Sequence, residues 1–364
     1  MAAGLYIHVP YCIKKCRYCD FYSLACKPGG TYVNAVIKAL GAYDGVSFDT
    51  VYFGGGTPSL LSPGQVYDIL SGADISPMAE VSMECNPGSV REGYFRELRQ
   101  AGVNRLSFGV QSFNDRELSL LGRLHNADEA ERAVLSAAGE GFDNISIDLM
   151  LGIPGQNMES LGETLSAAAR LPVSHVSAYM LKIEDGTPLS RDTELLRLVP
   201  DDDTAADMYL MTVDRLSFGE QGFEQYEISN FSRRGAECRH NLKYWRCEEY
   251  IGIGPAAHSF YGGRRYETPR DLAAFLSDPA APGVTEGYEG GSVPGGLHER
   301  FMLMMRLSEG FPVEMAGEAG LLKAALPLER AGLLKVSGDR IALTPRGFLV
   351  SNEIILRLSE VLPE

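Results

Sequence analysis

Three cysteines lie close together near the start of the chain: Cys12, Cys16 and Cys19, in the stretch HVPYCIKKCRYC. The spacing Cys-x3-Cys-x2-Cys follows neither the helical period nor the strand period, so these thiols do not look like three core residues of one element. Thiolates are the ligands of zinc and of iron–sulfur clusters. The spacing therefore indicates a metal or cluster site with three cysteine ligands.

Two kinds of site fit three cysteines. A structural zinc ion normally takes four protein ligands, and His8 is the nearest candidate for the fourth. A [4Fe–4S] cluster held by three thiolates instead leaves one iron open to an outside ligand. His8 lies within a predicted strand and Pro10 follows it, which disfavours the reach that zinc would need. The cluster is our preferred interpretation and zinc stays as the alternative.

Six short apolar runs, rich in β-branched and aromatic residues, have the composition of buried strands. They are LYIHV (5–9), TVYFGG (50–55), EVSMEC (80–85), RLSFGV (105–110), NISIDLML (144–151) and HVSAYM (175–180). Helical patterns between them cover 31–43, 63–71, 89–101, 127–140 and 159–170, and the glycines of AGV (101–103) and EGF (140–142) look like helix C-caps. Strict alternation predicts an α/β fold with a parallel sheet. A full barrel, a partial barrel and a doubly wound sheet all fit.

Polar and glycine residues gather where these predicted strands end. GGGTP (54–58) ends the second strand, and its glycines would let the backbone approach a ligand and expose its amides. Glu84 and Gln111 come at the ends of the third and fourth strands, and Asp148 lies in the fifth. Each alone has an ordinary explanation, such as a tight turn, a salt bridge or a helix cap. Their shared position predicts a ligand site, because parallel α/β folds bind ligands at the carboxyl ends of their strands.

The second half of the chain is less regular. Residues 202–220 are predicted to form a helix and FEQYEIS (223–229) a seventh strand. The stretch 278–297 is rich in Pro and Gly and reads as a linker or long exposed loop. Residues 298–364 look like helices around the turn VSGDR (336–340), as in a winged helix. This part has no excess of basic residues, so we do not expect it to bind nucleic acid.

Composition excludes several classes of function. The 364-residue chain has a formal net charge of -15, which disfavours a broad phosphate-binding surface. It contains no run of eighteen apolar residues, so we expect no integral membrane span, although peripheral contact stays open. The first eleven residues do not resemble a signal peptide. Seven cysteines in such a chain are typical of a reducing compartment, and we expect the cytoplasm.

The stretch CRHNLKYW (238–245) contains a second group of residues that could bind a cofactor. Imidazole is a common axial ligand of heme iron, and aromatic rings suit a porphyrin face. The alternative is a capped helix or loop whose aromatic side chains fill a gap in the core. No Cys-x-x-Cys-His is present, so Cys238 is not expected to attach heme covalently. The candidate heme residues are His240, Asn241, Tyr244 and Trp245.

Taken together, CIKKCRYC, GGGTP, ECNP (84–87), GVQSF (109–113) and IDLMLGIPGQ (147–156) resemble the radical S-adenosylmethionine (SAM) superfamily. Within it, the oxygen-independent coproporphyrinogen III oxidase group is the most similar. The resemblance implies a partial (β/α)6 TIM-like barrel with a small C-terminal winged-helix-like module. It divides the chain into a core barrel (1–235), an extension with the heme motif packing on the barrel (236–277), a linker (278–297) and the C-terminal module (298–364).

The same resemblance implies a [4Fe–4S] cluster on Cys12, Cys16 and Cys19, with SAM bound to its open iron. Its SAM contacts would be Tyr6 near the cluster, Tyr18 near the adenine, Gly55, Gly56 and Thr57 at the methionyl part, Glu84 and Gln111 at the ribose, Arg123 at the carboxylate, and Asp148 completing the pocket. These residue types suit the ligand, since a guanidinium binds a carboxylate and polar side chains bind ribose hydroxyls.

Two departures distinguish this chain from the oxidases. They usually carry a fourth cysteine two positions after the third, where this chain has Phe21, and a longer segment before the first strand. The pattern His-Asn-x-x-Tyr-Trp instead resembles that of heme chaperones. We therefore expect a protein that hands heme to acceptors such as respiratory cytochromes, with an electron donor for its cluster. Coproporphyrinogen III dehydrogenase activity in porphyrin biosynthesis and a zinc-stabilised scaffold are the alternatives, so enzymatic activity stays open.

Overall fold

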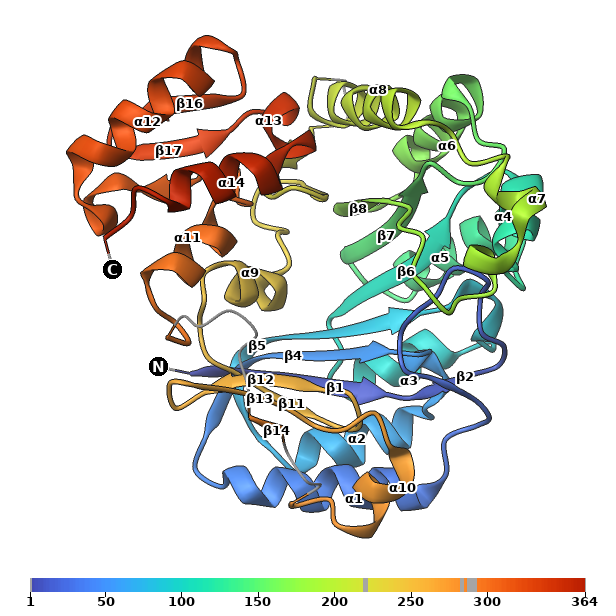
Figure 1. Ribbon diagram of the computed structural model, residues 1–364. Coiled ribbons are helices and arrows are strands. Elements are labelled where there is room, and N and C mark those ends of the chain that lie inside the picture. The colour runs from blue at the N-terminus through green and yellow to red at the C-terminus, as the bar shows by residue number, and fades with distance from the viewer. Residues whose placement is uncertain (1, 219–221, 282–284, 287–292, 364) are drawn as a thin grey trace.

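The computed structural model describes residues 2–218, 222–281, 285–286 and 293–363. Within them a sheet of 12 strands runs in the order β14-β13-β12-β11-β1-β4-β5-β6-β7-β8-β10-β9 (Figure 1). Within the run from β11 to β8, every pair of adjacent strands is parallel, and β12 and β10 pair antiparallel with its two ends. Because strands β1 to β8 follow one another in the sheet as they do in the chain, right-handed crossovers place their helices on one face. This is the arrangement of a partial barrel, and a doubly wound order is excluded.

The six predicted barrel strands are confirmed. They are β1 (Ala3–Val9), β4 (Ser47–Gly55), β5 (Asp74–Cys85), β6 (Arg105–Gln111), β7 (Asn144–Leu151) and β8 (His175–Met180). The helices between them are α1 (Gly30–Leu40), α2 (Pro63–Ser71), α3 (Tyr94–Gln100), α4 (Asp115–Leu121), α5 (Ala127–Gly139) and α6 (Met158–Arg170). The predicted helix 89–101 begins late, because Pro87–Ser89 form a short 3-10 turn first. Gly102 and Gly141 have positive φ after their helices, as the C-cap prediction required.

The prediction of one strand over 223–229 is wrong. The chain there forms β9 (Glu224–Gln225) and β10 (Asn230–Ser232), and β10 runs antiparallel to both β9 and β8. A tight turn separates them, closed by the Tyr226 amide, which donates to the Asn230 carbonyl at 3.1 Å. The predicted helix 202–220 appears as α8 (Asp202–Val213) with a π-helical extension to Phe218, and residues 219–220 lie outside the described part.

The other elements before the C-terminal part are further strands of the main sheet and three short helices that lie apart from one another (Figure 1). They are α7 (Thr193–Leu196), α9 (Arg239–Trp245), β11 (Tyr250–Ile253), β12 (His258–Tyr261), β13 (Arg264–Glu267), α10 (Leu272–Ser277) and β14 (Thr285–Glu286). Strand β14 lies inside the predicted linker 278–297, of which residues 282–284 and 287–292 are outside the described part. The division of the chain at residues 235, 277 and 297 stays a prediction.

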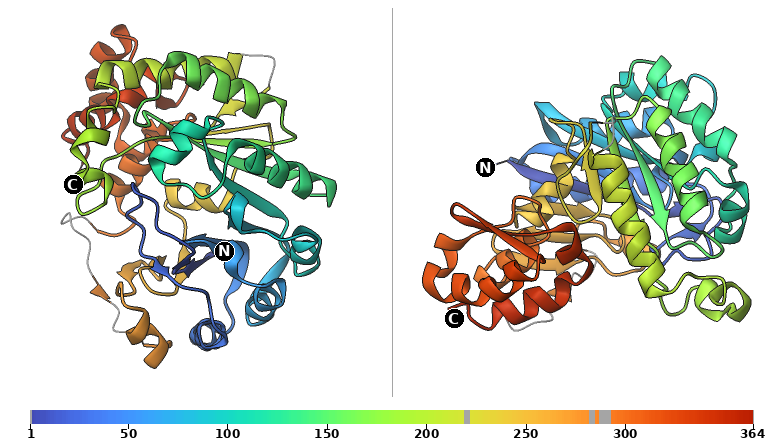
Figure 2. Two further views of the ribbon diagram at one scale, coloured as in Figure 1. Left: turned by 90° about the vertical axis from the view of Figure 1, so that its right-hand side faces the viewer. Right: turned by 90° about the horizontal axis from the view of Figure 1, so that it is seen from above.

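The C-terminal residues form their own small sheet, with the order β15-β17-β16. Its elements are α11 (Leu297–Met304), β15 (Phe311–Pro312), α12 (Glu318–Arg330), β16 (Leu334–Ser337), β17 (Arg340–Leu343), α13 (Pro345–Leu349) and α14 (Ser351–Ser359). Figure 2 shows this part on the side of the main sheet that α1 and α2 do not cover. None of the helices in the described residues has the length and apolar character needed to cross a membrane.

Candidate functional site

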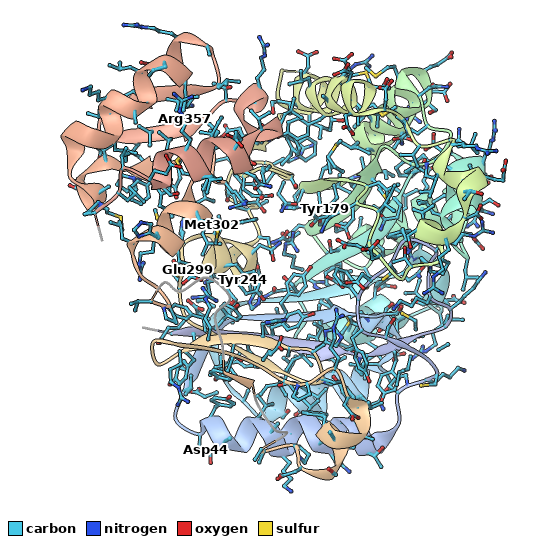
Figure 3. The ribbon with its side chains drawn as sticks, viewed as in Figure 1. Asp44, Tyr179, Tyr244, Glu299, Met302 and Arg357 are labelled. Atoms are coloured by element: carbon cyan, nitrogen blue, oxygen red, sulfur yellow. The ribbon has the colours of Figure 1, made fainter. Side chains whose placement is uncertain are left out.

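The face of the sheet that the outer helices leave uncovered is lined with polar and aromatic side chains. Because successive strand residues alternate between faces, Leu5, Phe53 and Met83 are fully buried in the apolar core beneath the helices. Their neighbours Tyr6, Tyr52 and Glu84 therefore point to the opposite face. Figure 3 shows Tyr179 of β8 and Tyr244 of α9 on that same side. The predicted ligand residues of the strands thus share one surface.

The three cysteines lie in a loop between β1 and α1 that starts at β2 (Tyr11–Cys12). Cys12 is buried, whereas Cys16 and Cys19 are partly exposed. The Thr57 hydroxyl donates a hydrogen bond to Cys12 Sγ at 3.3 Å. A second donor, Arg123 Nη1, lies 3.5 Å from Cys16 Sγ. Each contact thus brings a hydrogen-bond donor to a sulfur of the predicted cluster ligands.

Backbone hydrogen bonds hold this loop in place. The Arg17 amide donates to the Leu121 carbonyl at the end of α4 at 3.1 Å, and the Arg17 carbonyl accepts from the Leu189 amide at 2.8 Å. Near its return, the Leu24 amide donates to the Pro10 carbonyl at 2.9 Å. The loop is therefore ordered by its backbone, and the thiols of Cys16 and Cys19 stay partly exposed.

The first two glycines of GGGTP make room for side chains of β1. A Cβ at Gly54 would lie 2.8 Å from the Tyr6 ring, and one at Gly55 would lie 2.7 Å from the His8 ring. Gly55 also has a φ of 108°, which disfavours other residues. Both glycines are thus required by neighbouring protein atoms, whatever ligand is present.

Gly56 brings the cysteine loop against the sheet. A Cβ there would lie 2.5 Å from the Tyr11 carbonyl oxygen. The Gly56 amide donates to the Val9 carbonyl at 2.8 Å, and the Thr57 amide donates to the Tyr11 carbonyl at 2.7 Å. The expectation of exposed amides is therefore wrong for these two residues. Their amides instead tie the turn to the strand that carries Cys12.

Arg123 and Gln111 lie side by side at the end of β6. A Cβ at Gly109 would be 3.2 Å from Gln111 Nε2 and 3.3 Å from Arg123 Nη2, so both side chains pass over this glycine. Gln111 has a φ of 71°, an uncommon conformation for a non-glycine residue. Arg123 Nη2 donates to the Gly109 carbonyl, but its buried Nε has no partner. This unpaired donor fits an incoming carboxylate.

Two buried carboxyl groups lie on the same surface, and burial makes both of them costly to ionise. The Ser107 hydroxyl donates to Asp148 Oδ1 at 3.0 Å, and the Tyr52 hydroxyl donates to Glu84 Oε1 at 3.1 Å. Burial, helped by the nearby Asp148, raises the pKa of Glu84 to about 8. Burial also raises the pKa of Asp148, against the effect of its hydrogen bonds. Such paired, desolvated carboxyls are typical of ligand sites.

Tyr18 provides an apolar wall beside the cysteines. It packs on the buried cluster of Leu121, Met150 and Ile153. Burial raises the pKa of its hydroxyl, although the nearby Arg123 charge acts in the opposite direction. A neutral aromatic ring on an apolar patch suits a planar base such as adenine.

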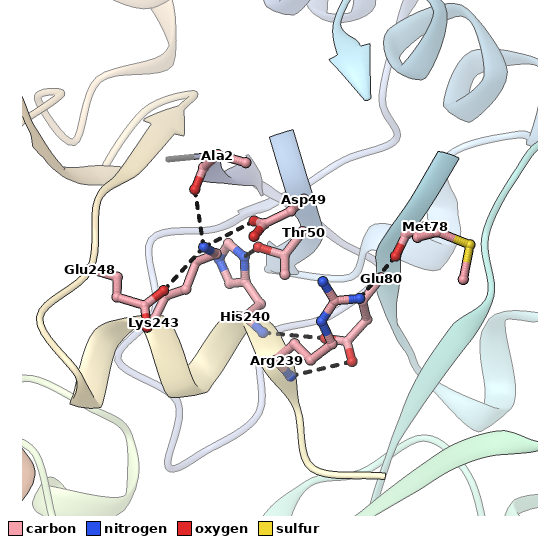
Figure 4. Close-up of polar contacts among 9 residues, drawn as sticks. All are labelled: Ala2, Asp49, Thr50, Met78, Glu80, Arg239, His240, Lys243 and Glu248. Atoms are coloured by element: carbon pink, nitrogen blue, oxygen red, sulfur yellow. Dashed lines mark hydrogen bonds and ion pairs between the residues drawn. The ribbon is translucent and has the colours of Figure 1, made fainter. Parts of the chain in front are cut away.

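The predicted heme residues lie on α9, and their histidine is enclosed. His240 is fully buried. Its Nδ1 shares a hydrogen bond with the Thr50 hydroxyl at 2.8 Å, and its Nε2 shares one with the Tyr244 hydroxyl at 2.8 Å (Figure 4 shows the Thr50 contact). Burial and the nearby Lys243 charge lower the pKa of His240 to about 3. The other predicted members, Asn241 and Trp245, are partly buried.

Several residues that hold α9 were not identified from the sequence. Glu80 of β5 accepts from the backbone amides of Arg239 and His240, both at 3.3 Å, at the start of the helix. The buried Lys243 ammonium contacts Asp49 at 2.9 Å and Glu248 at 3.2 Å (Figure 4). Glu80 and Asp49 are far from α9 in the sequence, so no local pattern pointed to them, whereas Glu248 follows Lys243 by five residues.

The structure does not favour His8 as a zinc ligand. His8 Nε2 shares a hydrogen bond with the Tyr22 carbonyl at 2.9 Å, and Nδ1 shares one with the Tyr6 hydroxyl at 3.2 Å. Among the described residues, no group of three or more His, Cys, Asp or Glu side chains is arranged to hold a single metal ion. A cluster does not require such convergence, because each thiolate binds its own iron.

Comparisons with known proteins show the family of the chain. The sequence profile of the radical SAM superfamily matches residues 6–168, and that of the HemN C-terminal domain matches residues 296–350. The coproporphyrinogen III oxidase HemN from Escherichia coli has the same fold, with a TM-score of 0.81 over 99% of this chain and 91% of that chain, at 20% identity. The chain is therefore a radical SAM protein with the HemN fold, and this class implies a [4Fe–4S] cluster and SAM.

Two relatives narrow the assignment further. The heme chaperone HemW of Mycobacterium tuberculosis is 37% identical over 98% of this chain and 94% of its own length. The heme chaperone HemW of Escherichia coli is also 37% identical, over 97% of both chains. The chain belongs to the HemW family.

Proposed function

We propose that this protein is a heme chaperone, which binds a [4Fe–4S] cluster, SAM and heme and passes the heme to acceptors such as respiratory cytochromes. The observation that carries the proposal is the end-to-end similarity to proteins named heme chaperone HemW. Phe21 supports it, because the fourth cysteine of the oxidases is missing there and the Phe21 side chain is 62% exposed.

The cluster and SAM are assigned to the surface at the carboxyl ends of the strands. Cys12, Cys16 and Cys19 would hold the cluster, which supplies electrons to the sulfonium of SAM when both are bound. The unpaired Arg123 Nε provides the donor for the SAM carboxylate. The other contacts assigned to SAM are Tyr6, Tyr18, Gly55, Gly56, Thr57, Glu84, Gln111 and Asp148.

Heme is assigned to α9, with His240 as the iron ligand and Asn241, Tyr244 and Trp245 around it. The lowered pKa keeps the His240 imidazole neutral, which is the form that binds iron. Both of its nitrogens are nevertheless hydrogen-bonded in this conformation. Binding through His240 therefore requires it to give up its contact with Thr50 or Tyr244.

A titration with hemin tests this assignment. His240→Ala should weaken hemin binding by at least about tenfold, measured from the Soret band. His175→Ala is the matched control, because His175 is also buried and also bonded through both nitrogens, to Ser146 and Tyr226 at 2.8 Å each. Equal hemin affinity in the wild type and His240→Ala would remove His240 from the heme site.

A transfer assay tests the function itself. Anaerobically reconstituted protein loaded with hemin should convert an apocytochrome to its heme-bound form faster than free hemin at the same concentration does. If the loaded wild-type protein delivers heme to the apocytochrome no faster than free hemin does, the chaperone function is contradicted. The heme acceptor and the electron donor of the cluster are the partners that this function implies.

The second candidate function is coproporphyrinogen III dehydrogenase, which the shared fold with HemN favours. Reduced, reconstituted protein is incubated with coproporphyrinogen III and SAM, and the porphyrins are separated after oxidation. We expect no protoporphyrin above the control without protein. Multiple turnovers would establish the dehydrogenase and contradict our preference.

A further inference from the structure

Tyr52 lies between the two proposed ligand sites and contacts both. Its hydroxyl donates to Glu84 Oε1 at 3.1 Å, on the side assigned to the SAM ribose. Its ring stacks on the His240 ring, with 5.4 Å between centroids and an interplanar angle of 25°. One side chain thus joins a carboxylate of the SAM pocket to the predicted heme ligand.

A third ring restricts the movement of Tyr52. The Tyr6 ring stacks on Tyr52 at 6.3 Å and 22°, and on His240 at 6.4 Å and 27°. The backbone at Gly54 borders both tyrosine rings, since a Cβ there would lie 2.8 Å from the Tyr6 ring and 3.2 Å from Tyr52 Cε1. Closely packed side chains have few voids between them, so a shift of one ring displaces its neighbours. Tyr52 therefore moves only if Tyr6 or His240 moves with it.

The hydrogen bond between Tyr52 and Glu84 responds to the occupant of the SAM pocket. Glu84 is buried next to Asp148, so without a ligand its carboxyl group holds a proton over much of the neutral range. Hydroxyl donors from a bound ribose favour the ionised carboxylate. A hydrogen bond to an ionised acceptor is stronger than one to a neutral acceptor. A bound SAM should consequently hold the Tyr52 ring more firmly against His240.

We propose that Tyr52 is a positioning residue that couples the two sites, so that bound SAM keeps His240 enclosed and weakens heme binding. The inference rests on the proposed function, because it assumes that both ligands bind where we assign them. By linkage, heme must weaken SAM binding by the same factor. The protein would then release SAM contacts as it takes up heme, and hold heme less tightly when SAM returns.

The test is a pair of hemin titrations on anaerobically reconstituted protein, with and without saturating SAM, under non-reducing conditions. In the wild type we expect SAM to raise the hemin Kd by about fivefold or more, the lower end of typical coupling. Tyr52→Phe keeps the stacked ring but loses the hydroxyl, and should reduce the effect to less than about twofold. Tyr43→Phe is the matched control, because it loses a remote hydroxyl contact, to Tyr266 at 3.0 Å.

The outcomes separate the coupling from the proposed function. A wild type that binds hemin and SAM independently, or binds hemin more tightly with SAM, overturns the coupling and leaves the chaperone function intact. An equal SAM effect in Tyr52→Phe overturns the role of Tyr52. A wild type that binds no hemin contradicts the proposed function itself. If Tyr52→Phe does not fold, the Soret band of the hemin-loaded wild type decides: an unchanged spectrum on addition of SAM overturns the coupling.

Discussion

The cysteine loop and helix α9 are built in opposite ways. In the loop, backbone hydrogen bonds provide the order and the chemistry-bearing atoms are left open: Cys16 and Cys19 are partly exposed, and the buried Arg123 Nε has no partner. In α9 the chemistry-bearing atoms themselves provide the order, because both His240 nitrogens are bonded within the protein. One region is prepared for its ligand and the other is satisfied without one.

This difference indicates different energetics for the two sites. A preorganised site gains the full interaction with its ligand, since little has to be rearranged. A site whose ligand atom is already hydrogen-bonded must first break that contact, and its apparent affinity falls with the population of the open state. Substitutions around α9 should therefore be able to raise or lower the affinity for heme. Substitutions in the cysteine loop should only lower the amount of cluster bound.

Replacing a cysteine should have the largest effect. Cys12→Ala should abolish stoichiometric cluster assembly, because a cubane held by three thiolates loses one of its anchors. Iron and sulfide content and the visible spectrum after anaerobic reconstitution measure it. Cys26→Ala is the control, since Cys26 is an exposed cysteine outside the triad, and it should assemble the cluster normally. Full cluster content in Cys12→Ala would contradict the assignment.

Disturbing the support of the loop should have the next largest effect. Gly56→Ala places a Cβ against the Tyr11 carbonyl, so the strand carrying Cys12 has to shift. We expect a loss of about 1–3 kcal/mol in the free energy of unfolding, measured by urea denaturation, and reduced cluster retention.

Gly139→Ala is the control for this substitution, because a Cβ at Gly139 in α5 meets nothing within 4 Å. It should leave cluster retention unchanged and stability unchanged or slightly higher. Equal retention in Gly56→Ala and the wild type would show that the loop does not depend on this close approach.

The sequence predicted the sheet and the cysteine loop better than the surroundings of α9. Strands 144–151 and 175–180 have their predicted bounds, because continuous apolar runs ended by polar residues define them. The cysteine spacing is a local pattern and could be recognised directly. The enclosure of His240 depends on Thr50, 190 residues away, and no local pattern encodes such a contact. The role of Gly56 likewise depends on a contact with a distant residue, the Tyr11 carbonyl of β2.

Removing the hydrogen bond between Thr50 and His240 should increase the affinity for heme. Thr50→Val keeps the shape of a fully buried side chain but removes the partner of His240 Nδ1. The unpaired nitrogen destabilises the enclosed state by about 1–3 kcal/mol, so hemin affinity should rise by about tenfold. Ser146→Ala, which removes the equivalent partner of His175 Nδ1, is the control and should leave hemin affinity unchanged. Weaker hemin binding in Thr50→Val would show that this contact belongs to the heme-binding conformation.

The pH dependence of SAM binding should be the smallest of these effects, and it tests the role of the Glu84 carboxyl group. The pKa of Glu84 is raised to about 8, and the ribose hydroxyls assigned to it donate to the ionised form. SAM affinity should therefore fall as the pH is lowered, by about fivefold between pH 8 and pH 7 from this group.

In Glu84→Gln this part of the pH dependence should be lost, and only the part that comes from the titration of SAM itself should remain. Glu227→Gln is the matched control, because burial raises the pKa of Glu227 to about 8 as well, but Glu227 lies between β9 and β10 and is not among the assigned SAM contacts. Identical pH profiles in the wild type and Glu84→Gln would remove Glu84 from the ribose site and leave the contrast between the two regions resting on the thiols and Arg123.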